Sequence, residues 1–127
     1  MARQSNNTDQ QPDAVRVLSQ AVTSAAELMG LNKATLAKVL GISPASAGRL
    51  FSGQYQLNPN SKEWDMALLL VRLFRSLDAI MAGDENALRS WLKSPNQGLN
   101  AKPLELMTDA AGLVHTVDYV DSYRARV

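Results

Sequence analysis

The sequence predicts an all-α protein, in which an N-terminal helix-turn-helix is followed by a small helical domain. Apolar residues recur three and four positions apart along most of the chain, and this spacing places them on one face of a helix. Glycines and capping residues separate these segments, and no segment alternates apolar and polar residues as a strand does. With 127 residues, the chain can form one compact domain or two very small domains that share a core.

The first predicted helix covers residues 13–29 and ends at Gly30, because glycine readily takes the left-handed conformation that closes a helix. The second covers residues 33–40 and ends at Gly41 for the same reason. Alternating spacings of three and four define the inward face of the first helix, which is formed by Val15, Leu18, Val22, Ala25 and Met29.

Residues 31–53, LNKATLAKVLGISPASAGRLFSG, have the spacing of a helix-turn-helix. Ser43 and Pro44 begin its second helix, because the serine oxygen caps free amides and proline loses no donor that is needed there. In such a motif a small residue allows close packing, a glycine makes the turn, and apolar residues anchor both helices. These parts are supplied by Ala37, Gly41, Ala47 and Leu50, supported by Leu36, Leu40 and Ile42. A helix pair without a DNA-binding function can share this spacing.

Acidic residues are absent between Glu27 and Glu63, although the net charge of the whole chain is only +1. The basic residues in this segment include Lys33, Lys38 and Arg49. In contrast, residues 61–127 hold eight Lys or Arg and nine Asp or Glu. A basic segment beside a balanced one predicts one anionic partner and one protein partner. The alternative is a solvated surface that happens to lack acids.

The helix that begins at Pro44 is expected to enter the major groove of operator DNA, with Ala45, Ser46 and Arg49 toward base edges. The two lysines and the amides of its first turn then face phosphates. Gly48 is unusual in this helix, because glycine costs roughly 1 kcal/mol relative to alanine. A monomer with so few cations gains little free energy from the release of counterions from DNA. Specific binding therefore requires a homodimer on paired half-sites. The candidate DNA-binding residues are Lys33, Lys38, Ser43, Ala45, Ser46 and Arg49.

A loop over residues 52–60 separates the two halves, and Ser61 begins a long helix that ends near Ala82. Apolar residues cover most of its circumference, and a helix of this kind is buried on several sides. It is therefore either the central helix of its domain or part of a dimer interface. For the second case, Leu69 and Leu73 are the candidate contacts between subunits.

Further helices are expected after Gly83, which stops the long one. Asp84 caps a helix that ends at Ser94, and Thr108 caps the last helix after a short helical turn over residues 104–107. The inward stripe of the last helix is predicted as Ala110, Leu113, Val114, Val117 and Val120.

The expected organisation is a disordered lead-in over residues 1–12, a helix-turn-helix domain over residues 13–60 and a helical domain over residues 61–127. The lead-in is polar and lacks the apolar stretch of a signal peptide. No apolar run approaches the roughly 20 residues of a membrane span. Cysteine is absent, which suits a reducing compartment. We therefore expect a cytoplasmic protein without a membrane partner.

The C-terminal half contains four segments in a recognisable order: WDMALLLVRLFRSLDAIMAGD, RSWLKSPNQGL, KPLELM and TDAAGLVHTVDYVDSYRARV. Together they resemble the toxin-binding domain of Xre/MbcA/ParS-type antitoxins, and the helix-turn-helix ahead of them resembles the Xre members. The resemblance covers residues 31–127. In the family a glycine usually precedes the Lys/Arg-Pro step, but Asn100 and Ala101 stand there in this sequence. The conformation of this turn is therefore not predicted.

The resemblance implies a partner, a RES-domain toxin that attacks NAD. The antitoxin would inhibit it by covering the toxin's active-site pocket with its C-terminal region, and would repress the operon that encodes the pair. Residues 61–127 would then serve toxin binding and dimerisation.

The last predicted helix carries two tyrosines and the only histidine on the face opposite its apolar stripe. This composition suits a protein interface, because tyrosine adds a large contact area at low entropic cost. The tail adds two guanidinium groups and a terminal carboxylate. The alternatives are that the tyrosines cover the preceding loop and that the tail is an ordinary frayed terminus. The candidate toxin-binding residues are His115, Tyr119, Ser122, Tyr123, Arg124, Arg126 and Val127.

Enzyme function is not predicted, because the sequence has no Gly-rich phosphate loop, no nucleophile elbow and no metal-ligand cluster. No cofactor is expected either. The alternative function is a stand-alone helix-turn-helix transcriptional regulator whose C-terminal domain binds a small ligand or only dimerises. A RES-type toxin gene beside this one would favour the antitoxin.

Overall fold

The computed structural model describes the backbone of residues 2–126 and the side chains of residues 13–125, and over these residues it is all-α, as predicted. The side chains of the predicted lead-in, residues 1–12, lie outside the described ones, so its disorder stays a prediction, as does the division into domains. The helices are α1 (Ala2–Met29), α2 (Lys33–Leu40), α3 (Pro44–Phe51), α4 (Lys62–Ile80), α5 (Glu85–Lys93), α6 (Pro103–Leu106) and α7 (Ala110–Arg126).

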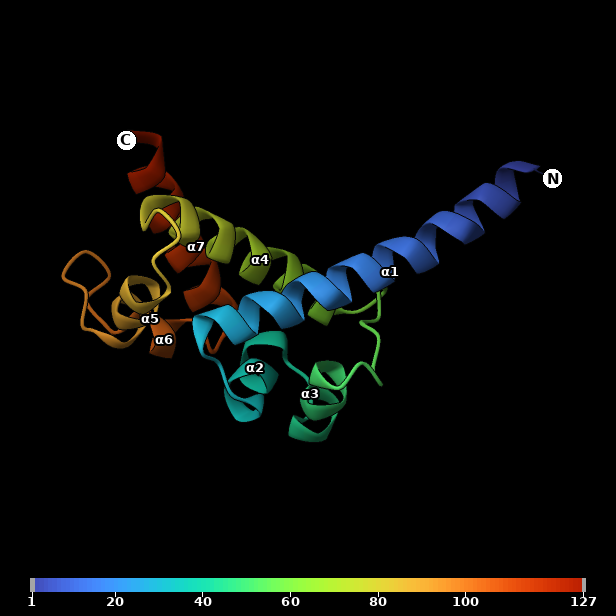
Figure 1. Ribbon diagram of the computed structural model, residues 1–127, viewed down its shortest axis with the longest axis horizontal. Coiled ribbons are helices and arrows are strands. Elements are labelled where there is room, and N and C mark those ends of the chain that lie inside the picture. Colours follow the sequence, from blue (N-terminus) through green and yellow to red (C-terminus); the bar gives the residue numbers. More distant parts are fainter. Residues whose placement is uncertain (1, 127) are drawn as a thin grey trace.

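The central helix is α4, which packs against α1, α2, α5 and α7. In the view of Figure 1, α2 and α3 lie below α1, whereas α4 and α7 lie above it. α1 contacts α4 and α5, and α4 contacts α7. The buried apolar residues form one core, to which α1 contributes Val22, α2 Leu36, α4 Leu70 and α7 Leu113. The helix-turn-helix is therefore built onto the same core as the C-terminal helices.

Most of the predicted helix ends are confirmed. Gly30 and Gly41 adopt left-handed φ angles of 76° and 73° after α1 and α2. The side chains of Ser43 and Asp84 accept hydrogen bonds from backbone amides in the first turns of α3 and α5. These ends are determined by residues at the ends themselves, which explains why the sequence predicts them.

The beginning of α7 differs from the prediction, because Thr108 is not its cap. The Thr108 hydroxyl donates to the Glu105 carbonyl at 2.7 Å, whereas Asp109 Oδ1 accepts the Gly112 amide at 2.7 Å. Asp109 therefore caps α7. Ser61 precedes α4 as expected, but its side chain accepts no capping hydrogen bond and instead donates to a carbonyl of the preceding loop.

Two predicted helix faces are also wrong in part. Val114 is 42 % exposed, whereas Thr116 is fully buried and its hydroxyl donates to a carbonyl one turn earlier at 2.8 Å. A buried threonine is tolerated here because this hydrogen bond satisfies its polar group. On α4, Leu73 is fully buried in the core and Leu69 is half-buried. Leu73 is therefore not a subunit contact, and Leu68 is the exposed leucine of this helix.

Arg89 of α5 connects the C-terminal half to the end of α1. Its Nε donates to the Leu28 carbonyl and its Nη2 to the Glu27 carbonyl, both at 3.0 Å. The last carbonyls of a helix have no partner within the helix, so these bonds satisfy them. The Arg89 side chain passes over Gly30, where an added Cβ would lie only 3.3 Å from its Nε.

The turn before α6 forms without the usual glycine. Asn100 has a φ of 58°, and asparagine tolerates this left-handed conformation better than most residues. The amide of Asn96 donates to the carbonyl of Ala101 at 3.0 Å and closes the turn. The departure from the family pattern therefore preserves the turn.

Candidate functional site

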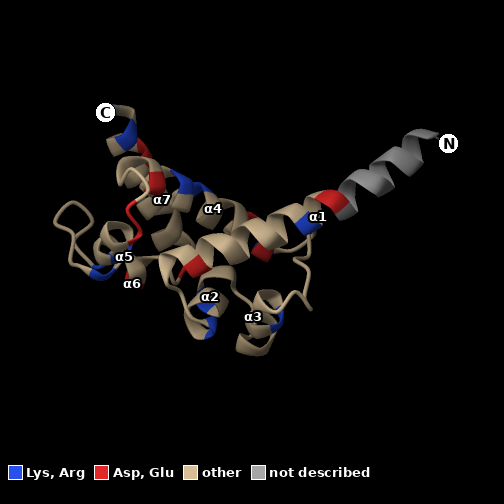
Figure 2. Ribbon diagram, viewed as in Figure 1, with Lys and Arg blue, Asp and Glu red and all other residues tan. Residues whose placement is uncertain are grey.

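Helices α2 and α3 present a basic surface without acidic residues. Lys33, Lys38 and Arg49 are all exposed, as predicted, and Figure 2 shows basic residues but no acidic ones on these two helices. In Figure 1 the two helices lie at the lower edge of the molecule, whereas the C-terminus lies at its upper left. Such a surface can accept the phosphates of a nucleic acid.

Hydrogen bonds connect the polar side chains at the start of α3. Ser43 Oγ donates to Ser46 Oγ at 3.0 Å, and Arg49 Nη2 donates to the same Ser46 oxygen at 3.1 Å. Ala45 is exposed beside them. The structure thus brings four of the six predicted DNA-binding residues together. The guanidinium is held in place before any ligand arrives, which lowers the entropic cost of binding.

The side chain of Lys33 lies against the glycine inside α3. A Cβ added at Gly48 would lie 3.1 Å from Lys33 Cδ, so the lysine stem crosses close to the α3 backbone. Its charge therefore lies beside the predicted recognition helix. Lys38 is exposed near the end of α2.

Tyr55 holds the loop after α3 against α4. Its hydroxyl donates to Glu63 Oε2, which also accepts the Asn58 amide at 2.9 Å. Burial, followed by the hydrogen bond and the charge of Glu63, raises the pKa of Tyr55 to about 12, while the charge of Arg49 acts in the opposite direction.

We expect the raised pKa of Tyr55 to make folding weaker at high pH. The unfolded tyrosine ionises near pH ~10 while the folded one keeps its proton, so the stabilisation is complete below pH ~10 and declines toward pH ~12. Tyr55→Phe removes this decline. Denaturant unfolding of both proteins at about pH 9 and about pH 11 measures it. Equal losses of unfolding free energy in the two proteins would contradict the assignment.

Tyr119 is placed differently from the other residues predicted on its face of α7. It is half-buried and packs against the loop before α6, where a Cβ at Gly98 would lie 2.5 Å from the Tyr119 hydroxyl oxygen. Tyr119 thus covers this loop, which is one of the alternatives that the sequence left open.

The other predicted residues of this face are exposed, and they extend along α7 toward its end: His115, Ser122, Tyr123 and Arg124. Tyr123 keeps 51 % of its surface exposed. The side chains of Arg126 and Val127 lie outside the described residues.

An apolar pocket of about 270 Å³ opens beside the two tyrosines, between the end of α4, α5 and α7. Its lining contains no charged residue and consists of Leu77, Ile80, Met81, Trp91, Tyr119, Val120 and Tyr123. Ligand sites for small molecules commonly span roughly 300–1,000 Å³. This pocket is below that range and suits a single large apolar side chain.

Two family models match the chain, one over the half that contains α2 and α3 and one over the half that contains α7. Residues 10–72 match the antitoxin Xre-like helix-turn-helix domain, and residues 76–126 match the antitoxin Xre/MbcA/ParS C-terminal toxin-binding domain. The chain belongs to the Xre/MbcA/ParS-type antitoxins. No curated protein matches it. The antitoxin thus combines a DNA-binding module with a toxin-binding one, and the resemblance that the motifs predicted is confirmed.

The antitoxin also has a polar network that the sequence did not predict. Ser76 Oγ donates to Asp121 Oδ1 at 3.0 Å and accepts from Arg124 Nη1 at 3.2 Å, and Arg72 forms an ion pair with Asp121. The network joins α4 to the end of α7, so Arg124 is held against α4. The sequence places Arg72 and Ser76 one turn apart on α4, but contains no local signal for their partners on α7.

No cluster of three or more potential metal-ligating side chains occurs among the residues of the antitoxin that the structure describes. Over the same part of the chain, no helix is both long and apolar enough to cross a membrane.

Proposed function

We propose that the antitoxin inhibits a RES-domain toxin that degrades NAD, by covering the toxin's active-site pocket with its C-terminal region. It also represses the operon that encodes the pair, as a homodimer in the cytoplasm, and acts by binding rather than by catalysis. The observation that supports this proposal is that α3 and the end of α7 lie at opposite sides of the molecule (Figure 1). One antitoxin can therefore bind operator and toxin at once.

The chemistry of the α7 end suits a pocket built for NAD. Such a pocket holds a pyrophosphate, so its lining includes cations and amide donors. Tyrosines fill apolar space, and arginines pair with acids at the rim. The apolar pocket beside Tyr119 and Tyr123 accepts one large side chain of the toxin. The proposed toxin-binding residues remain His115, Tyr119, Ser122, Tyr123, Arg124, Arg126 and Val127.

Co-expression with the neighbouring reading frame, followed by co-purification and an NAD assay, tests the proposed partner. We expect a stable complex that does not consume NAD, and NAD loss when the neighbouring product is made alone. A neighbouring product that consumes NAD equally well with and without the chain would instead favour a stand-alone regulator.

The DNA-binding surface is tested by two variants with different expected effects. Arg49→Ala should lose discrimination between operator and random DNA by about 1–3 kcal/mol, because it removes a base contact. Lys38→Ala should weaken both about equally, since a phosphate contact carries no sequence information. Gel shifts with both DNAs measure the ratio. An unchanged operator preference of the Arg49 variant would show that α3 is not the recognition helix as placed here.

A further inference from the structure

The end of α7 extends beyond the hydrophobic core. Val120 is the last residue of this helix whose side chain belongs to the core, Asp121 is partly buried, and residues 122–125 are all exposed. Helix ends without buried side chains unfold most easily, because little apolar contact opposes their fraying. Most of the residues that the proposed function assigns to the toxin follow Val120, so the core does not stabilise the part of α7 that carries them.

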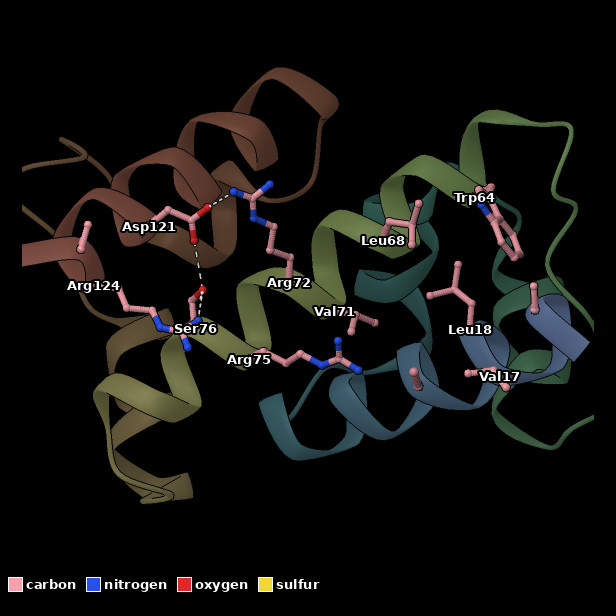
Figure 3. A pocket seen from close by; sticks show the side chains of 13 residues that line it. Val17, Leu18, Trp64, Leu68, Val71, Arg72, Arg75, Ser76, Asp121 and Arg124 are labelled. Atoms are coloured by element: carbon pink, nitrogen blue, oxygen red, sulfur yellow. Dashed lines mark hydrogen bonds and ion pairs between the residues drawn. The ribbon is translucent and has the colours of Figure 1, made fainter.

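The polar network between α4 and α7 supplies the contacts that the core does not. The Ser76 hydroxyl of α4 donates to Asp121 Oδ1 at 3.0 Å, and the guanidinium of Arg72 pairs with the same carboxylate. Ser76 is only 2 % exposed and also accepts a hydrogen bond from Arg124. Figure 3 shows these contacts, which lie at one end of a groove along α4. Asp121 is therefore the residue through which α4 holds the last turns of α7.

Arg72 determines whether Asp121 can stay in this place. Asp121 Oδ2 is buried, and the guanidinium of Arg72 lies against it. A buried carboxylate oxygen that loses its cationic partner raises the free energy of the folded state, because it has been removed from water without compensation. Without Arg72 the carboxylate regains solvation only by moving away from α4, and this movement displaces the end of α7.

We propose that Arg72 and Asp121 are positioning residues for toxin binding. Their ion pair keeps the last turns of α7 helical and held against α4, so that the toxin meets an ordered surface. Order that exists before binding lowers the entropic cost of association. Neither residue itself contacts the toxin in this proposal. The inference rests on the proposed function, because it takes the end of α7 as the toxin contact.

Amide hydrogen exchange of the antitoxin alone tests whether the ion pair orders the end of α7. Arg72→Ala and Asp121→Asn should each accelerate exchange of residues 121–126 by about fivefold, the effect of losing one net hydrogen bond, and leave exchange in α2 and α3 unchanged. Arg75→Ala and Asp118→Asn are matched controls. They remove the same charges from exposed residues of the same helices that form no ion pair among the described side chains. Unchanged exchange in the first two variants would overturn the proposal.

The affinity for the co-purified product of the neighbouring reading frame tests whether this order matters for toxin binding. Arg72→Ala and Asp121→Asn should each weaken binding by about fivefold, and the double variant by no more than either alone, because both act through one contact. Arg72→Lys keeps the charge and should restore most of the affinity. Operator binding, measured by gel shift, should be the same for all variants, which shows that the fold is intact.

The two measurements together separate the positioning role from the proposed function. Accelerated exchange with an unchanged affinity would overturn the positioning role, and so would a double variant whose loss of binding is the sum of the two single losses. If the unmodified antitoxin does not bind the neighbouring product at all, both proposals fail. If it binds and the Arg72→Ala and Asp121→Asn variants bind equally well, only the positioning role fails.

Discussion

Replacing Gly112 with alanine is expected to destabilise the described core strongly. Gly112 lies in the first turn of α7, where an added Cβ would overlap the backbone carbonyl of Leu106 in α6. A backbone atom cannot rotate away as a side chain can, so the two helices must separate. Overpacking of a core costs about 1–3 kcal/mol, and we expect the upper end here. Thermal unfolding should show a melting temperature lower by on the order of 10 °C.

Gly41→Ala is the matched control for this prediction. Nothing lies within 4 Å of an added Cβ at Gly41, so only its left-handed φ of 73° opposes alanine. That conformational cost is about 1–2 kcal/mol for a residue other than glycine. A Gly112 variant that is as stable as the Gly41 variant would mean that α6 moves aside without loss.

Removal of residues 124–127 is expected to release the toxin from inhibition while the antitoxin still binds DNA. The deletion takes away both arginines proposed to pair with acidic groups at the rim of the toxin pocket. Hot-spot residues at interfaces contribute 2 kcal/mol or more, and about 1.4 kcal/mol corresponds to tenfold in affinity. NAD loss by a toxin mixed with the shortened antitoxin should therefore rise at least about tenfold over the full-length complex.

A second variant distinguishes the effect of losing the last residues from the effect of breaking the polar network between α4 and α7. Arg124→Ala removes the hydrogen bond to Ser76 but keeps Arg126 and Val127. If the last two residues carry inhibition, this variant still inhibits. Complete inhibition by the shortened chain would instead assign the toxin contact to the α7 face of His115 and Tyr123.

The features that the sequence predicts well are those set by neighbouring residues. Gly41, Ser43 and Asp84 end or begin helices through contacts within four positions of themselves. The helix-turn-helix has the same local character, since its spacing reflects the packing of two adjacent helices. Its outward residues, including Arg49, follow directly from that packing.

What the sequence misses depends on contacts between distant segments. The burial of Thr116 in place of Val114 follows from how α7 is rotated against α4, and a period of 3.6 does not fix that rotation. Tyr119 packs against Gly98 of another segment. The bond between Ser76 and Asp121 spans 45 positions, so no local pattern contains both partners. These contacts shape the C-terminal half, which is why the placement of its side chains was predicted less well than that of the helix-turn-helix residues.

The single hydrophobic core has a thermodynamic consequence for how the two binding activities depend on each other. Because α1, α4 and α7 share that core with α2 and α3, the toxin-binding helices cannot unfold and leave the DNA-binding ones intact. Any ligand that binds only the folded chain shifts the unfolding equilibrium of all of it, by about 2.7 kcal/mol when free ligand exceeds its dissociation constant a hundredfold. A toxin that binds at α7 as proposed would therefore protect α3 from unfolding as well, and the supply of toxin would set how much folded DNA-binding protein persists.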